Sequence, residues 1–110
     1  MEREIVFSKN VEIYLNELML LLFEKGYFSF PSFAKQYVDA LVLYIEKNVG
    51  MIQGRIAPDF FNRFGKNMKY ITYRSNTNTT WYVFYQKCEN IFLIKHISNN
   101  HVSAQYFVGF

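Results

Sequence analysis

The chain has 110 residues and half of them are apolar, a length and composition that support one core and exclude a disordered segment. The longest apolar run, residues 18–23, is too short for a membrane helix, and Glu2 and Glu4 stand where a signal peptide carries cations. The single cysteine, Cys88, excludes an internal disulfide and gives no metal-ligand spacing. We therefore expect one cytoplasmic domain, residues 1–110, with no metal site and no cofactor.

The first half of the chain predicts a strand and two helices. Residues 2–8 are predicted to form a short strand whose side chains alternate between its two faces. A helix is expected over residues 10–25, and Gly26, the next residue, ends it. A second helix is expected over residues 32–48, and Gly50 ends it. Two neighbouring amphipathic helices with a short connection predict a helical hairpin. The apolar positions at helical spacing are Val11, Leu15, Leu18 and Leu22 in the first helix and Phe33, Tyr37, Leu41, Tyr44 and Ile45 in the second.

Residues 51–67 have no stable period and contain Gly54, Pro58 and Gly65. We interpret them as a long connection with one helical turn around residues 59–64. A structureless loop of this length is uncommon unless it is functional.

The remaining segments predict strands, because they are rich in aromatic and β-branched residues. They cover residues 69–74, 79–87 and 91–97, with compact polar turns between them. The element order is then βααβββ, an α+β fold in which the hairpin packs on one face of an antiparallel sheet of about four strands. We expect His96 to share a face with Phe92 and Ile94. The residues expected to be buried are Leu15, Leu18, Leu22, Tyr37, Leu41, Ile45, Val83 and Leu93.

Charge is distributed unevenly along the chain. Residues 1–50 carry a net charge of −2 and residues 51–110 carry +5. Between positions 55 and 74 only Asp59 opposes a group of basic residues, which comprises Arg55, Arg63, Lys66, Lys69 and Arg74. A basic half favours an acidic partner, either nucleic acid or an acidic protein segment, and a merely solvated cationic surface is the alternative.

Four segments resemble one family of proteins. These are residues 4–8 (EIVFS), 57–67 (APDFF through GKN), 79–85 (TTWYVFY) and 97–107 (ISNNHVSAQYF). Together and in this order they resemble the RelE/ParE superfamily of bacterial toxins, and in particular its ParE-like branch. The last two segments are the most specific.

The resemblance implies a toxin of a type II toxin–antitoxin system, neutralised by a partner antitoxin. ParE-like members inhibit DNA gyrase, whereas RelE-like members cleave messenger RNA on the ribosome without a metal. The shared fold does not choose between these targets. Without its antitoxin, such a chain is expected to self-associate as a homodimer through the apolar surface that the antitoxin would cover.

Cleavage of RNA without a metal needs a base, an acid and cations around the phosphate. His101 and Tyr106 match the terminal His/Tyr position of nucleolytic members, so the resemblance makes them the catalytic candidates. A turn histidine is the alternative for His101. The strand over residues 81–85 lacks the arginine that nucleolytic members carry there, which favours target binding over cleavage. Two other functions stay open, a ribosome-dependent nuclease and a non-catalytic interaction domain. The target-binding candidates are Arg55, Arg63, Lys66, Lys69 and Arg74.

Overall fold

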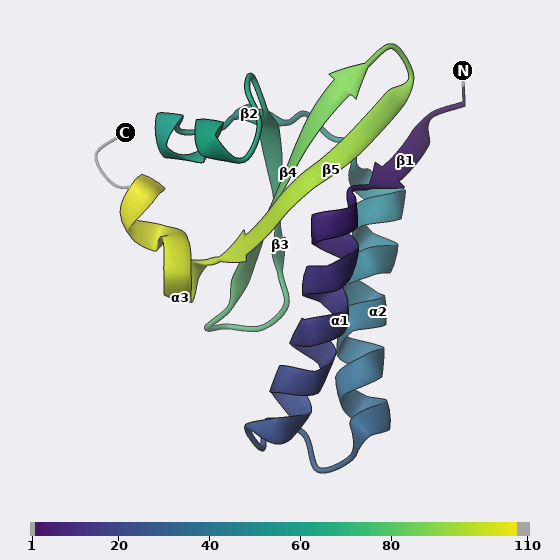
Figure 1. Cartoon of the computed structure of the whole chain (residues 1–110), viewed down its shortest axis with the longest axis vertical. Coiled ribbons are helices and arrows are strands. Elements are labelled where there is room, and N and C mark those ends of the chain that lie inside the picture. Colours follow the sequence, from purple (N-terminus) through teal and green to yellow (C-terminus); the bar gives the residue numbers. More distant parts are fainter. Residues whose placement is uncertain (1, 108–110) are drawn as a thin grey trace.

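The computed structural model describes residues 2–107 and has an α+β fold (Figure 1). Two long helices pack beside a twisted sheet, and short helical segments lie on the other side of it. The elements in chain order are β1 (Glu4–Phe7), α1 (Lys9–Glu24), α2 (Pro31–Asn48), β2 (Arg55–Ile56), the 3-10 helix η1 (Asp59–Arg63), β3 (Lys69–Arg74), β4 (Thr80–Cys88), β5 (Ile91–Asn99), α3 (Asn100–Ser103) and the 3-10 helix η2 (Ala104–Phe107).

The sheet has five strands in the order β1-β5-β4-β3-β2. The prediction of about four antiparallel strands was wrong in two respects. Strand β1 pairs with β5 in parallel, which the long crossover through the helices permits. Strand β2 lies inside the connection at residues 51–67 and pairs only Arg55 and Ile56 with β3, too short a run to show a period.

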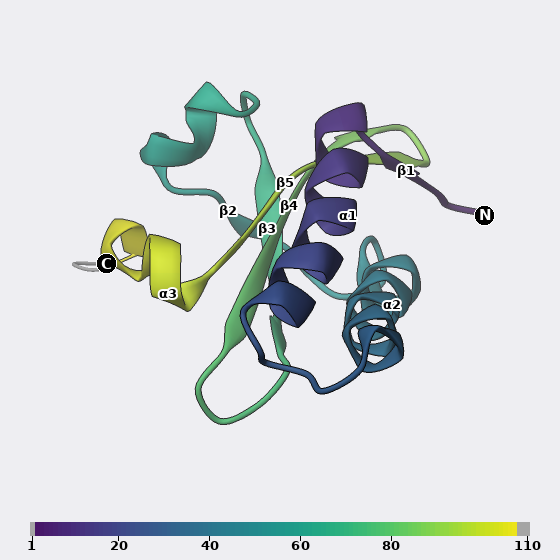
Figure 2. The same ribbon diagram turned by 60° about the horizontal axis from the view of Figure 1, so that its bottom comes forward.

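Both helices begin and end close to the predicted residues. The Ser8 Oγ accepts a hydrogen bond from the Val11 N–H at 3.2 Å and caps α1. Gly26 follows α1 with φ of +77°, a conformation that favours glycine. Pro31 opens α2, where its missing N–H costs nothing. The two helices cover the same face of the sheet (Figure 2), as predicted.

The first core lies between these helices and the sheet. Five predicted core residues are buried there, namely Leu15, Leu18, Leu41, Ile45 and Val83. Leu22 and Tyr37 are half-buried at its edge. The prediction for Leu93 was wrong, because it is half-buried on the opposite face of β5. Phe33, assigned to the apolar face of the second helix, is 46% exposed, because Ala34 and Val38 occupy the buried stripe of α2.

A β-bulge in β5 explains the position of His96. Tyr85 pairs with Ile94 and Phe84 pairs with His96, so Lys95 is an extra residue without a partner on β4. Phe92 and Ile94 therefore face the helices, whereas His96 faces the opposite side. The prediction of one shared face for these three residues was wrong, because strict alternation fails at the bulge.

A second core lies on the face of the sheet away from the helices. Phe61 of η1 and Phe84 of β4 are fully buried there, with ring centroids 4.3 Å apart. The predicted helical turn is therefore confirmed, and it covers the second face. The buried members are Ala57, Phe61, Met68, Tyr70 and Phe84, with Phe60, Tyr82, Tyr106 and Phe107 packed around them.

Within residues 2–107, no helix combines the length and apolar character needed to cross a membrane.

Candidate functional site

A groove of about 950 Å³ opens on the helix-free face of the sheet beside the second core. We call it the aromatic groove, because five of its lining residues are aromatic. Its floor comes from β3 and β4, one wall from residues 55–60 and the other from the end of η2. The lining residues are Arg55, Ile56, Ala57, Pro58, Asp59, Phe60, Tyr70, Thr72, Thr80, Tyr82, Tyr106 and Phe107.

Strand alternation supplies the floor. Ile71 and Tyr73 of β3 pack toward the helices, so Tyr70 and Thr72 face the groove. Trp81 and Val83 of β4 do the same, so Thr80 and Tyr82 face the groove. The floor therefore alternates hydroxyl and aromatic groups. Tyr82 is the ring of β4 that lines the groove, because the first core buries Trp81 and η1 covers Phe84.

Two stacked ring pairs form the walls. Tyr106 stacks on Phe60 with centroids 3.5 Å apart, and Phe107 stacks on Tyr82 at 4.3 Å. These pairs join the C-terminal segment to residues more than twenty positions away in the chain. Flat rings at the rim of a concave site are suited to stacking on a planar ligand group or a partner side chain.

The polar groups of the groove are two charged side chains and several hydroxyl groups. Arg55 and Asp59 are exposed at the rim, and the Thr72 and Thr80 side chains lie on the floor. Burial, and then the neighbouring Tyr70, raises the pKa of Tyr82 above its ordinary value of 10.0. The Tyr82 hydroxyl therefore stays protonated at neutral pH and can donate a hydrogen bond to a bound group.

Two predicted site residues line this groove. Arg55 brings the only cationic side chain of the lining, and Tyr106 brings a half-buried phenol. They stand on opposite walls, one on β2 and the other on η2. Arg55 and Tyr106 therefore belong to one site although half the chain separates them.

Two other predicted residues lie at the β3–β4 turn instead. The His101 Nε2 is 3.0 Å from the Thr79 Oγ1, and the ring is exposed to solvent. The Arg74 guanidinium donates from Nε and Nη2 to the backbone oxygens of Asn76 and Thr77, at 3.3 and 3.2 Å. Neither residue lines the aromatic groove.

The remaining predicted cations are spread over other surfaces. The Arg63 guanidinium lies 3.9 Å above the Phe60 ring, and its Nε donates to the Phe60 backbone oxygen at 3.0 Å. Lys69 lies on the same side of β3 as Ile71 and Tyr73, the side that faces the helices, and is next to the backbone of Gly54. Lys66 lines a separate hollow of about 350 Å³. The five basic candidates therefore do not form one cluster.

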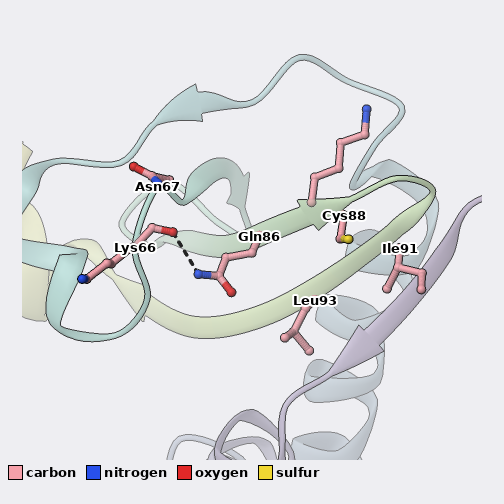
Figure 3. Close-up of a pocket in the computed structure, with 7 residues that line it drawn as sticks. Lys66, Asn67, Gln86, Cys88, Ile91 and Leu93 are labelled. Atoms are coloured by element: carbon pink, nitrogen blue, oxygen red, sulfur yellow. Dashed lines mark hydrogen bonds between the residues drawn. The ribbon is translucent and has the colours of Figure 1, made fainter.

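Figure 3 shows the hollow that contains Lys66. The Gln86 Nε2 donates to the Lys66 backbone oxygen at 2.9 Å, which ties the loop before β3 to β4. Cys88, Ile91 and Leu93 also line the hollow. This environment explains why Leu93 is only half-buried.

The second histidine, His96, is part of the packing and not of the groove. Its ring stacks on Phe64 with centroids 3.8 Å apart and an interplanar angle of 4°. Burial lowers the pKa of His96 below its ordinary value of 6.5, so the imidazole is neutral at pH 7. This agrees with a partly buried structural histidine.

Within residues 2–107, no histidine lines the aromatic groove, and no three His, Cys, Asp or Glu side chains gather closely enough to hold a metal ion. The groove can thus bind through ring stacking, one guanidinium and several hydroxyl groups. Its lining holds one carboxylate, Asp59, and the phenols of Tyr70, Tyr82 and Tyr106 as groups able to exchange protons.

Several lining residues were not predicted as site residues. Phe60, Thr80 and Phe107 lie in segments that resemble the toxin family but have no assigned role there, and Thr72 lies in none of these segments. Only the tertiary fold brings the four together. A usable signal was the strand alternation that places Thr72 and Thr80 opposite the helix-facing residues. The stacking of Phe107 over Tyr82 had no sequence signal.

No protein-family model, curated protein or solved structure matched the chain in the three comparisons made.

Proposed function

We propose that the chain is the toxin of a type II toxin–antitoxin pair, that it inhibits gyrase or translation by binding through the aromatic groove, and that a partner antitoxin neutralises it. The resemblance of residues 79–85 and 97–107 to ParE-like toxins supplies the class of function. The observation that carries the proposal is the groove itself. Its volume of about 950 Å³ lies in the range of binding sites for ligands and inserted side chains.

The composition of the groove favours binding over RNA cleavage. Cleavage without a metal needs a base, an acid and cations that converge on one phosphate. The groove lining has a single cation, Arg55, and His101 lies outside it with its Nε2 next to Thr79. Aromatic residues and arginine are the side chains that contribute most to binding at protein interfaces.

The test is to induce the chain in bacteria and follow growth, messenger 5′ ends and gyrase supercoiling in parallel. We expect growth arrest without codon-positioned cuts. Arg55→Ala and Tyr82→Ala should relieve the arrest, because they remove the guanidinium and the central ring of the groove. The matched controls are Lys47→Ala and Tyr27→Ala, both exposed and on or beside α2, which should leave the arrest intact. The midpoint of thermal unfolding of each variant separates lost binding from lost folding.

Two outcomes would replace the proposal. Codon-positioned cuts that disappear in Tyr106→Phe would indicate a ribosome-dependent nuclease, with the Tyr106 phenol as a proton donor. Unimpaired growth on induction would leave a non-catalytic interaction domain.

A further inference from the structure

A second, shallower groove runs along α1, on a surface that shares no lining residue with the aromatic groove. It consists of two hollows of about 390 and 310 Å³, which meet at Tyr14. Along α1 the lining residues Asn10, Tyr14, Glu17, Leu21 and Glu24 follow one another at spacings of four and three. We call this surface the α1 groove.

The spacing of the α1 groove is that of a helix-packing seam. Alternating steps of four and three residues keep one line of side chains facing a neighbouring helix. From Asn10 to Glu24 the helix rises about 21 Å, enough to accommodate a second helix of the same length. The shape therefore fits a helix as occupant.

The two ends of the α1 groove differ in shape. The end near Asn10 is bordered by β5 and η1, which contribute Lys95 and Arg63. The end near Glu24 is lined by residues of α1 and projects beyond the strands (Figure 1). There Leu20 and Leu21 are 55% and 46% exposed. The Asn10 end is thus a hollow walled by β5 and η1, whereas the Glu24 end is a shallow, open surface of α1 that carries exposed leucines.

The two ends also differ in charge. Arg63 and Lys95 are the only ionisable side chains, besides neutral His96 and the Tyr14 phenol, in the lining of the hollow end. Glu17 and Glu24 flank the leucines of the protruding end. A surface with a basic hollow at one end and an acidic open surface at the other is complementary to itself when turned end over end.

We propose that the α1 groove joins two copies of this chain as a two-fold dimer, with the two α1 helices antiparallel and centred on Glu17. A two-fold axis at Glu17 pairs positions whose numbers sum to 34, so Leu20 of one copy faces Tyr14 of the other. Leu21 likewise faces Ile13, which is itself 46% exposed. The protruding end of each copy lies against the hollow end of the other.

The charges support this direction of pairing. At each end Glu24 of one copy approaches Arg63 and Lys95 of the other, an attractive contact. At the centre the two Glu17 carboxylates face each other, a repulsive contact that limits the affinity. The aromatic groove shares no lining residue with the α1 groove, so the dimer leaves it open and does not depend on the proposed function.

The experiment is sedimentation velocity on the full chain over a wide range of concentration. We expect a reversible dimer that Glu17→Gln tightens by about twofold, because one like-charge pair disappears. Glu24→Lys and Arg63→Glu should each weaken the dimer by a similar factor, and the double variant should recover most of the loss. Leu20→Ser should weaken it further, whereas Leu43→Ser, 65% exposed on α2, is the matched control and should not.

Charge-swap recovery separates a pairing effect from misfolding, because a variant that only damaged the fold would not recover in the double variant. A monomer at all concentrations would overturn the proposal. A dimer that Glu17→Gln, Glu24→Lys and Leu20→Ser leave unchanged would also overturn it and assign the interface to another surface. A monomer that binds an unrelated amphipathic helix through Leu20 would replace the second copy with a different partner.

Discussion

Replacement of Phe61 tests whether η1 is attached to the sheet as the structure shows. The Phe61 side chain is fully buried and forms ring contacts with Phe84 at 4.3 Å and Phe107 at 5.4 Å. A buried aromatic side chain removes roughly 150–250 Å² from water, and Phe→Ala changes at such positions cost about 3–5 kcal/mol. We expect Phe61→Ala to lower the free energy of unfolding by about 4 kcal/mol, a large part of the stability of a small domain.

The measurement is urea unfolding followed by circular dichroism, with amide hydrogen exchange to locate the loss. Phe61→Leu keeps most of the volume and should cost about 1.5 kcal/mol or less. Loss of exchange protection should be greatest at residues 57–68 and 104–107, since those segments contact Phe61 directly. A cost below about 1 kcal/mol for Phe61→Ala would refute the reasoning, because it would mean that η1 is detached from the sheet in solution and that the aromatic groove has no such wall.

Three further predictions concern contacts outside the second core. The Arg3 guanidinium donates to three carbonyl oxygens at the end of α2, those of residues 46, 47 and 49, so Arg3→Ala should lower the free energy of unfolding by about 1–2 kcal/mol and Arg3→Lys by less. Tyr37→Phe should cost about 1–3 kcal/mol in urea unfolding, because the buried Trp81 Nε1–H donates to the Tyr37 hydroxyl at 2.9 Å and would lose its acceptor. Burial lowers the pKa of His96, so the folded state holds the neutral imidazole and is destabilised when the ring is protonated. This stability is complete above the unfolded-state pKa of about 6.5 and is lost as pH falls through the folded-state pKa. Unfolding midpoints should therefore fall more between about pH 7 and about pH 5 in the parent chain than in His96→Phe, which keeps the stacking on Phe64 and does not titrate.

The helices were predictable because their signals are local. The residues that end them, Gly26 and Gly50, have φ of +77° and +86°, and the apolar spacing of α1 identified its buried face. Phe33 lies near the apolar stripe in the sequence pattern but is exposed, because in the first turn of α2 the small Ala34 packs against the core instead. A hydrophobic residue within a periodic pattern is buried only if the partner surface reaches it, and the sequence pattern does not contain the partner surface.

The sequence predicted the three long strands of the sheet, but it did not predict the short edge strand β2 or the register of β5 after Lys95. Three long strands follow from aromatic and β-branched content, whereas the two-residue β2 exists only because β3 offers it an edge. The bulge at Lys95 has no glycine to mark it. Because one extra residue reverses every later side chain, the face of His96 could not be derived from alternation.

Only some residues of the aromatic groove could be identified from the sequence. Arg55 and Tyr106 were selected separately, one for its charge and the other for its resemblance to a terminal motif, and they line the same groove. The groove exists because β3 and β4 present one face to the helices and leave the other to segments from the middle and the end of the chain. Its walls are therefore held by long-range stacking, such as that of Tyr106 on Phe60, and not by any local pattern.

The construction of the groove also bears on how function and stability are related in this chain. The first core, between the helices and the sheet, contains most of the buried aliphatic residues and does not form the groove walls. The walls rest on the second core, which is smaller and is covered by η1 and η2. Segments with few buried contacts open locally at lower free energy than the global unfolding of a protein. Binding through the groove should therefore be lost under milder conditions than the helical hairpin, because opening of the C-terminal segment removes Tyr106 and Phe107 while the first core remains intact.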